Sequence, residues 1–173
     1  MQTIMYIMEC IFTFATLLIA VVNLYFVYHF HKKNKESDED REEKNRRINL
    51  LKTLVLDYNM IYLYEFFDNC DNKCRGLKIK GLNDSQKKLI NDSLISFERK
   101  FENQFLSLLI GINDELYLSI KDLIDNMIDN FTNSIFDPGI NLYVEEKYND
   151  IIYNSIISTK KDVISVLFNY KGD

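Results

Sequence analysis

The stretch that decides the fold is CIFTFATLLIAVVNLYFVY, which runs from Cys10 to Tyr28. It holds no charged residue over 19 positions, close to the ~20 apolar residues that an α-helix needs to cross a hydrocarbon core of ~30 Å. The chain has 21 lysines and arginines, all at or after Lys32, and only Glu9 of its 26 acids precedes that point. An apolar run with such flanks predicts a transmembrane helix within residues 1–31.

The flanks of this run also predict its orientation. Lys32, Lys33 and Lys35 follow it and nothing basic precedes it, so the positive-inside rule puts the N-terminus outside and the rest of the chain in the cytoplasm. Tyr28 would lie beside the lysines at the headgroup level, where an amphipathic ring is favoured. A cleaved secretory signal and a buried soluble helix are the alternatives. Since the Asn- and Ile-rich composition suits an A+T-rich bacterial genome, we expect a single-pass protein of a bacterial inner membrane.

Polar and small residues of the predicted span fall on one stripe. Glu9, Thr13, Thr16, Ala20 and Asn23 are three or four residues apart, so they share one face of a helix. Polar groups inside a bilayer seek partners, and we expect copies of the chain to associate along this stripe. A large enough ring would enclose a polar-lined lumen. The alternative is a lone anchor whose threonines bond to their own backbone carbonyls.

Residues 32–47 form a second region, rich in both signs of charge. Three acids each precede a base by four residues, which is the favourable order on a helix. We expect a charged juxtamembrane helix that continues to about residue 68, either paired with neighbouring copies or solvated on its own. The pairs are Asp40 with Lys44, Glu42 with Arg46, and Glu43 with Arg47.

Residues 48–173 are expected to form an all-α body of about four helices. Apolar residues recur at helical spacing in four segments joined by short connections, which favours antiparallel packing in a bundle. A capping box at Asn83 and Gln86 starts the second helix, and Asp137–Gly139 ends the third. A loop is expected over residues 69–84. The predicted stripes are Ile48, Leu51, Val55, Tyr58, Tyr62 and Phe66; Ile90, Leu94, Phe97, Phe101, Phe105, Leu108 and Ile112; Leu116, Ile120, Leu123, Met127, Phe131 and Ile135; and Val144, Tyr148, Ile152, Ile156, Val163, Leu167 and Tyr170.

Composition argues against several functions. From Lys32 onward there are 21 basic and 25 acidic residues, a net charge of −4, so direct nucleic-acid binding is not expected. The only histidines, His29 and His31, lie at the predicted membrane edge, which leaves the body without a histidine base. No glycine-rich phosphate loop is present. We therefore expect neither an enzyme nor a bound cofactor.

Two features of the body remain as candidate sites. Cys70 and Cys74 are expected to be reduced thiols in the cytoplasm; a metal site or a regulatory disulfide is the functional alternative to an ordinary helix end, and no metal is expected because zinc wants four ligands. Asp122, Asp125 and Asp129 lie on successive turns and are expected to form a solvated face.

The layout of a span, MECIFTFATLLIAVVNLYFVYHFHKK at residues 8–33, then a charged helix and a compact helical body, resembles the membrane accessory proteins of type VI CRISPR antiphage systems. The resemblance implies a pore of several identical subunits that augments antiviral defence, with the bilayer, other copies and a CRISPR effector or other defence protein as partners. It also implies a HEPN-like body. The HEPN nuclease pattern of Arg, four to six residues and His is absent, because no arginine precedes either histidine, so the resemblance favours a pore over RNA cleavage.

Overall fold

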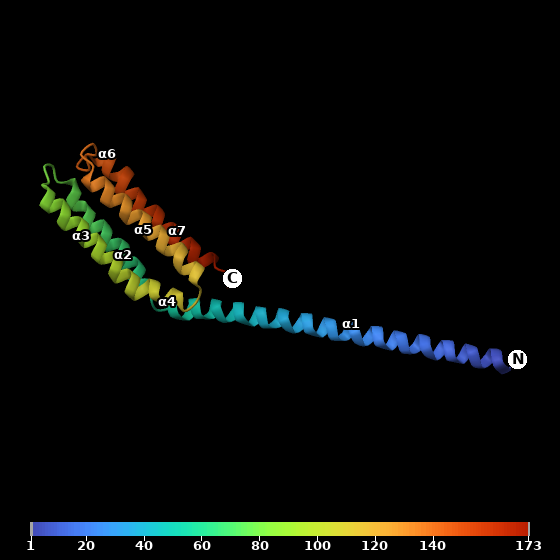
Figure 1. Ribbon diagram of the computed structural model, residues 1–173. Helices are drawn as coiled ribbons and strands as arrows, with labels where there is room; N and C mark the ends of the chain where they lie inside the picture. Colours follow the sequence, from blue (N-terminus) through green and yellow to red (C-terminus); the bar gives the residue numbers. More distant parts are fainter. Residues whose placement is uncertain (1, 173) are drawn as a thin grey trace. The chain divides into compact units, whose positions relative to one another are not determined.

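The computed structural model describes the backbone of residues 2–172, and the side chains of this range except those of 2–11, 13, 15 and 36. The chain divides into two compact units, residues 1–43 and 44–173. All regular elements of the described residues are helices (Figure 1), which confirms the all-α prediction.

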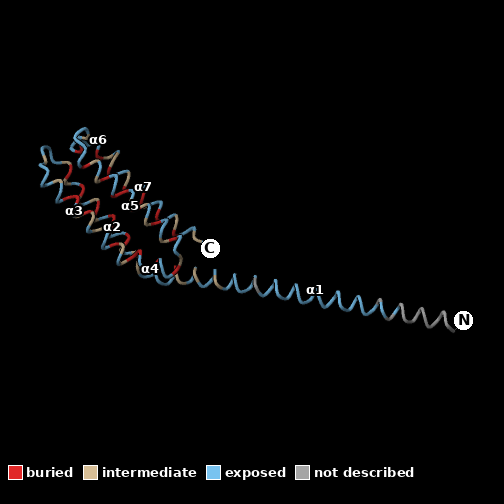
Figure 2. Tube along the Cα trace, viewed as in Figure 1, coloured by how far each residue is buried: buried red, intermediate tan, exposed pale blue. Residues whose placement is uncertain are grey.

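Helix α1 runs without interruption over Gln2–Leu50. Its residues up to 43 form the first unit, and residues 44–50 belong to the second. The helix contains neither Gly nor Pro, the two residues that most strongly break helices. Where its side chains are described, α1 is almost entirely exposed (Figure 2).

The chain breaks where one long helix was expected. A π-helical segment, Leu51–Leu56, follows α1, a turn occupies residues 57–59, and α2 covers Met60–Cys74. The Asn59 side-chain amide donates a hydrogen bond to the Leu54 carbonyl across this break. The expected helix to about residue 68 is therefore wrong. Because the break resets the helical phase, Tyr58 is exposed rather than in the core.

The second unit is a bundle, as predicted (Figure 1). We call its four parts rods, each of which is one helix or a run of consecutive helical segments. The first rod packs on the second, the second on the third and the third on the fourth, and the fourth also contacts the first. The rods are α2; α3 (Asp84–Phe101) with the π-helical Glu102–Leu106 and α4 (Ser107–Ile110); α5 (Asp114–Phe136); and α6 (Glu145–Tyr148) with the π-helical Asn149–Tyr153 and α7 (Asn154–Asn169).

Side-chain caps start two of these rods. The Asn83 side chain accepts a hydrogen bond from the Gln86 amide at 2.9 Å, and the Gln86 side chain accepts one from the Asn83 amide at 3.0 Å, which confirms the capping box. Asn113 caps α5 by accepting from the Leu116 amide at 2.8 Å. Asp137 accepts from the Gly139 amide at 2.7 Å in the turn that follows α5. These local bonds explain why the connections are short and sharply placed.

Buried residues line the inner faces of all four rods (Figure 2). Between the first two rods, the Phe101 ring stacks on Phe66 with centroids 4.6 Å apart and on Phe105 at 4.9 Å. The predicted stripes of the last three rods are largely confirmed as core, although Val144 is exposed because it lies just before α6. Ile48 is also exposed.

The expected loop over residues 69–84 is shorter than predicted. Helix α2 continues through Cys74, a 3-10 turn covers Arg75–Lys78, and α3 begins at Asp84. Leu77 in the turn is buried, so hydrophobic packing holds this segment in a helical turn despite Gly76. Gly81 has φ of +82°, a left-handed conformation that favours glycine.

Candidate functional site

Helix α1 presents apolar side chains to solvent on all its faces between Phe12 and Phe30. The large apolar residues in this stretch expose between 47% (Val22) and 73% (Phe12) of their surface. Six consecutive positions from Leu17 to Val22 are exposed, and together they cover more than one full turn. Apart from the polar stripe, the surface of this stretch is apolar, which is typical of a helix whose surroundings are not water.

The predicted stripe is held on one helix, although only part of it has described side chains. Ala20 and Asn23 are exposed. Thr16 is exposed too, and its hydroxyl donates to the Phe12 carbonyl at 2.8 Å, the intrahelical bond by which a threonine is tolerated in an apolar helix. The side chains of Glu9 and Thr13 lie outside the described residues.

The predicted interface anchors follow the apolar stretch. Tyr28, Lys32, Lys33 and Lys35 are all exposed. The Lys35 ammonium lies 3.7 Å from a Glu39 carboxylate oxygen, one turn along the helix. A helical pair of this kind contributes only ~0.3–0.5 kcal/mol, so it leaves the lysine able to meet an anionic surface.

No helix combines enough length and apolarity to span a bilayer when only residues with described side chains are counted. Of the predicted span, residues 1–31, the side chains of residues 1–11, 13 and 15 lie outside the described residues.

Cys70 and Cys74 are buried in α2 and show no exposed surface. Burial is the main cause that raises the pKa of both thiols, with Glu98 and Cys74 adding to the effect on Cys70, and Asp71 on Cys74. The pKa of Cys74 rises to about 12, so both stay protonated at neutral pH and are poor nucleophiles. Among the described residues no group of three or more His, Cys, Asp or Glu side chains is placed to hold a metal ion.

A polar network joins the second and third rods. The Lys121 ammonium lies 3.0 Å from Asp125 and 3.7 Å from Glu102. The Tyr117 hydroxyl donates to Glu102 at 3.1 Å. Asp125 was expected on a solvated face with Asp122. It is half-buried in this network, whereas Asp122 is exposed, so the expectation is wrong for Asp125.

Glu98, half-buried on α3, completes the network. Partial burial, then the interaction with Asp125 on α5, raise the pKa of Glu98 to about 7, against the opposing effect of Lys121. Sequence reasoning missed Glu98, although it lies between Leu94 and Phe101 on the stripe of α3 that faces the core.

An open polar pocket of about 670 Å³ lies between the end of α2 and the α6–α7 rod. Its two cations are already paired: Arg75 with Asp71 at 2.6 Å, and Lys78 with Glu145 at 2.9 Å. The Lys78 ammonium also lies 4.4 Å from the centroid of the Tyr148 ring. With its charges neutralised internally, this pocket offers no strong site for an anion. Asn149, Tyr153 and Asn154 complete its lining.

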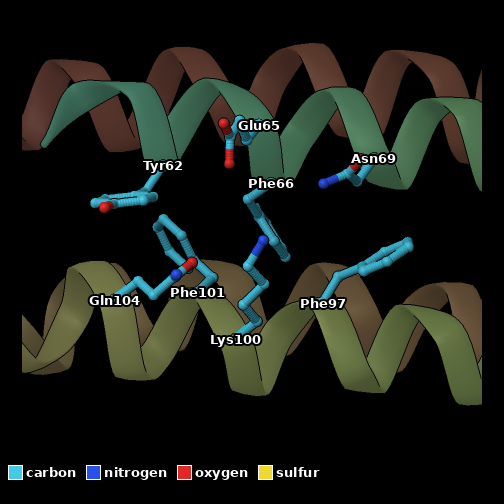
Figure 3. A pocket seen from close by; sticks show the side chains of 8 residues that line it. All are labelled: Tyr62, Glu65, Phe66, Asn69, Phe97, Lys100, Phe101 and Gln104. Carbon is cyan, nitrogen blue, oxygen red and sulfur yellow. The ribbon is translucent and has the colours of Figure 1, made fainter.

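A shallow groove separates α2 from α3. Figure 3 shows Glu65 on α2 and Lys100 on α3 at its edges, with Phe66 and Phe101 at its floor. Its volume is about 10 Å³, which is room for a single water. It therefore has no capacity for a substrate.

Neither a protein-family model, nor a curated protein, nor a solved structure matches this chain.

Proposed function

We propose that the protein is a single-span membrane protein whose copies associate through the polar stripe and form or gate a pore. The observation that carries the membrane part is the exposed apolar surface of α1 between Phe12 and Phe30. At 1.5 Å per residue the uncharged run from Cys10 to Tyr28 is about 28 Å long, which matches a hydrocarbon core.

The lysines after the run support a cytoplasmic location of the body. Each of Lys32, Lys33 and Lys35 adds on the order of 1 kcal/mol of attraction to an anionic leaflet. With no basic residue before the run, the body occupies the cytoplasmic side. The bundle then sits at the inner surface of the membrane, where it can receive a signal from a cytoplasmic partner such as a defence effector.

The stripe supports self-association. A polar side chain such as Asn23 can form a hydrogen bond with the same side chain on another copy. Each interhelical hydrogen bond in a bilayer stabilises the association by ~0.6–2 kcal/mol. A ring of copies would direct Glu9, Thr13, Thr16 and Asn23 to a common axis. Permeabilisation of the membrane in an infected cell is the activity that such a ring would perform.

The test is a triple substitution of the stripe. Thr13→Leu, Thr16→Leu and Asn23→Leu together should abolish dye uptake by cells that make the protein, while thermal unfolding of the body stays unchanged. The matched control changes Phe14, Val21 and Val22, on the opposite faces, to Leu and should retain dye uptake. Wild-type uptake by the stripe variant would count decisively against the pore.

A second function, a membrane-tethered adaptor for a cytoplasmic protein, is favoured by the hydrogen bond from Thr16 to Phe12. A hydroxyl satisfied within its own helix needs no neighbouring copy. An adaptor would keep its function when a foreign single-span anchor replaces residues 1–31, whereas a pore would lose it. The chimera and the stripe variant therefore separate the two functions.

A further inference from the structure

A second pocket, of about 230 Å³, lies at the end of the bundle where α2 connects to α3 and α5 connects to α6 (Figure 1). It shares no lining residue with the polar pocket described above. Buried side chains of Leu77, Ile135 and Leu142 give it an apolar floor. Ile79 and Tyr143 also line it, with 61% and 41% of their surface exposed. Apolar surface is therefore open to a partner at this end of the bundle.

The size of this pocket suits a single side chain. Sites for small molecules usually have volumes of ~300–1,000 Å³, so a volume of about 230 Å³ is small for a substrate or a cofactor. At protein interfaces, most of the binding energy comes from a few anchor side chains that fill pockets on the partner. A leucine or phenylalanine side chain of a bound peptide is an occupant of suitable size and polarity.

Positive charge surrounds the pocket, although the protein as a whole is acidic. Residues 73–88 contain six basic residues and one acid, and residues 135–146 contain three acids and no base. The two segments together carry a net charge of +2, in a chain whose net charge is −5. Lys87 lines the pocket, and the Lys80 ammonium lies 5.7 Å from the centroid of the Tyr143 ring.

These two lysines are not neutralised within the chain. Among the side chains that the structure describes, no carboxylate forms an ion pair with Lys80 or Lys87. The neighbouring Lys78 differs, because it is paired with Glu145 at 2.9 Å. Lys80 is exposed and Lys87 is half-buried. Both ammonium groups are thus free to meet negative charge on a partner.

We propose that this end of the bundle, residues 77–87 and 135–143, is a docking site for an acidic peptide segment of a partner protein. We call it the lysine tip. One bulky apolar side chain of the segment fills the pocket, and carboxylates next to it meet Lys80 and Lys87. The unpaired lysines select the acidic residues by charge complementarity, and the pocket volume selects the single apolar anchor.

This docking site does not depend on the membrane function proposed above. A pore would use it to receive a signal from a partner, and a tethered adaptor would use it to hold one. The experiments below measure binding by the bundle and not permeabilisation. Loss of the docking site and loss of the pore would therefore give different results.

The first experiment selects peptides without assuming their sequence. A phage-displayed library of short random peptides is panned on the full-length protein in nanodiscs of neutral phosphatidylcholine. The double variant Lys80→Glu with Lys87→Glu is panned in parallel. Peptides enriched on the wild type and not on the variant should be acidic and carry a bulky apolar residue. Enrichment of no such peptide, or of neutral or basic peptides only, would overturn the proposal.

The second experiment measures the affinity of an enriched acidic peptide by fluorescence anisotropy. The double lysine variant should bind it at least ~10-fold more weakly, because like charges then face each other. Ile79→Asp, at an exposed position beside the pocket, should weaken binding without disturbing the core. Lys161→Glu, exposed on α7 and outside the pocket, is the matched control and should bind as the wild type does.

Unchanged affinity in both the double lysine variant and Ile79→Asp would overturn the proposal. Vesicles that contain anionic phosphatidylserine provide the remaining comparison. If they bound through Lys80 and Lys87 while no acidic peptide was enriched, the lysine tip would recognise a lipid surface instead, and the peptide proposal would be overturned.

Discussion

The segment Phe12–Phe30 of α1 and the four rods of the bundle are both helical and both contain many apolar residues, yet they differ in how far these residues are exposed to solvent. The rods bury one face each and leave charged residues on the other, whereas α1 exposes apolar side chains on every face. The bundle thus buries its apolar side chains against other parts of the same chain, whereas those of α1 between Phe12 and Phe30 stay exposed. What distinguishes them is both the density of apolar residues, which is higher in Phe12–Phe30, and their distribution around the helix.

The largest expected difference between the two regions comes from the removal of a phenyl ring. Phe105→Ala deletes a ring with no exposed surface that stacks on Phe101 at 4.9 Å, and should lower the free energy of unfolding by ~3–5 kcal/mol. Phe12→Ala removes the same ring where 73% of the residue is exposed and should leave it unchanged. Denaturant unfolding of the full-length protein in micelles measures both. Equal losses in the two variants would show that α1 is packed against protein.

A charge placed on the apolar surface is the next sharpest test. Leu18→Arg, on the side of α1 opposite the polar stripe, should cost ~2.5–3.5 kcal/mol of membrane insertion and shift the protein out of the membrane fraction. Ile79→Arg changes another exposed apolar residue, in the loop after α2, and should leave the distribution unchanged. Fractionation of cells followed by immunoblotting measures this. Retention of the Leu18→Arg protein in carbonate-washed membranes would contradict the span.

The bundle was predictable from sequence because its stripes and caps are local signals. Asn83 with Gln86 and the apolar spacing of α3 and α5 indicate where helices begin and which face is buried. The break after α1 was not predictable, since residues 51–59 contain neither Gly nor Pro and the burial of Leu51 and Val55 in the core depends on the tertiary fold. Tertiary packing overrides helix propensity there.

The polar network escaped prediction for a related reason. Glu98 and Asp125 appear as ordinary surface acids on separate helices, and only the pairing of α3 with α5 brings them together. The one available signal was Glu98 on a core-facing stripe, where an acid is costly unless it has a partner. Sequence periodicity identifies such a position but not the residue it will meet.

Within the bundle, the Tyr148 hydroxyl has no hydrogen-bond partner among the described residues although its surroundings are buried. Tyr148→Phe removes this hydroxyl, keeps the ring beneath Lys78, and should raise the stability of the fold by about 1 kcal/mol. Tyr28→Phe makes the same change on exposed α1 and should not alter unfolding of the body. Calorimetry of both variants gives the comparison; destabilisation by Tyr148→Phe would show that the hydroxyl is engaged.

The smallest expected effect concerns how the helices of the two regions begin. Asn83 starts α3 by accepting from the Gln86 amide, so Asn83→Ala should lower the free energy of unfolding by ~1 kcal/mol. Asn34 lies exposed in the interior of α1, where alanine is the better helix former by ~0.5 kcal/mol. Asn34→Ala should therefore leave unfolding of the bundle unchanged and slightly increase helicity in circular dichroism. The same substitution would thus destabilise the bundle and favour the helix in α1. In α3 the asparagine caps the start of a helix, whereas in α1 it lies in a helix interior, where alanine is preferred. A loss of stability in Asn34→Ala as large as that in Asn83→Ala would mean that α1 is itself capped or bent near this residue.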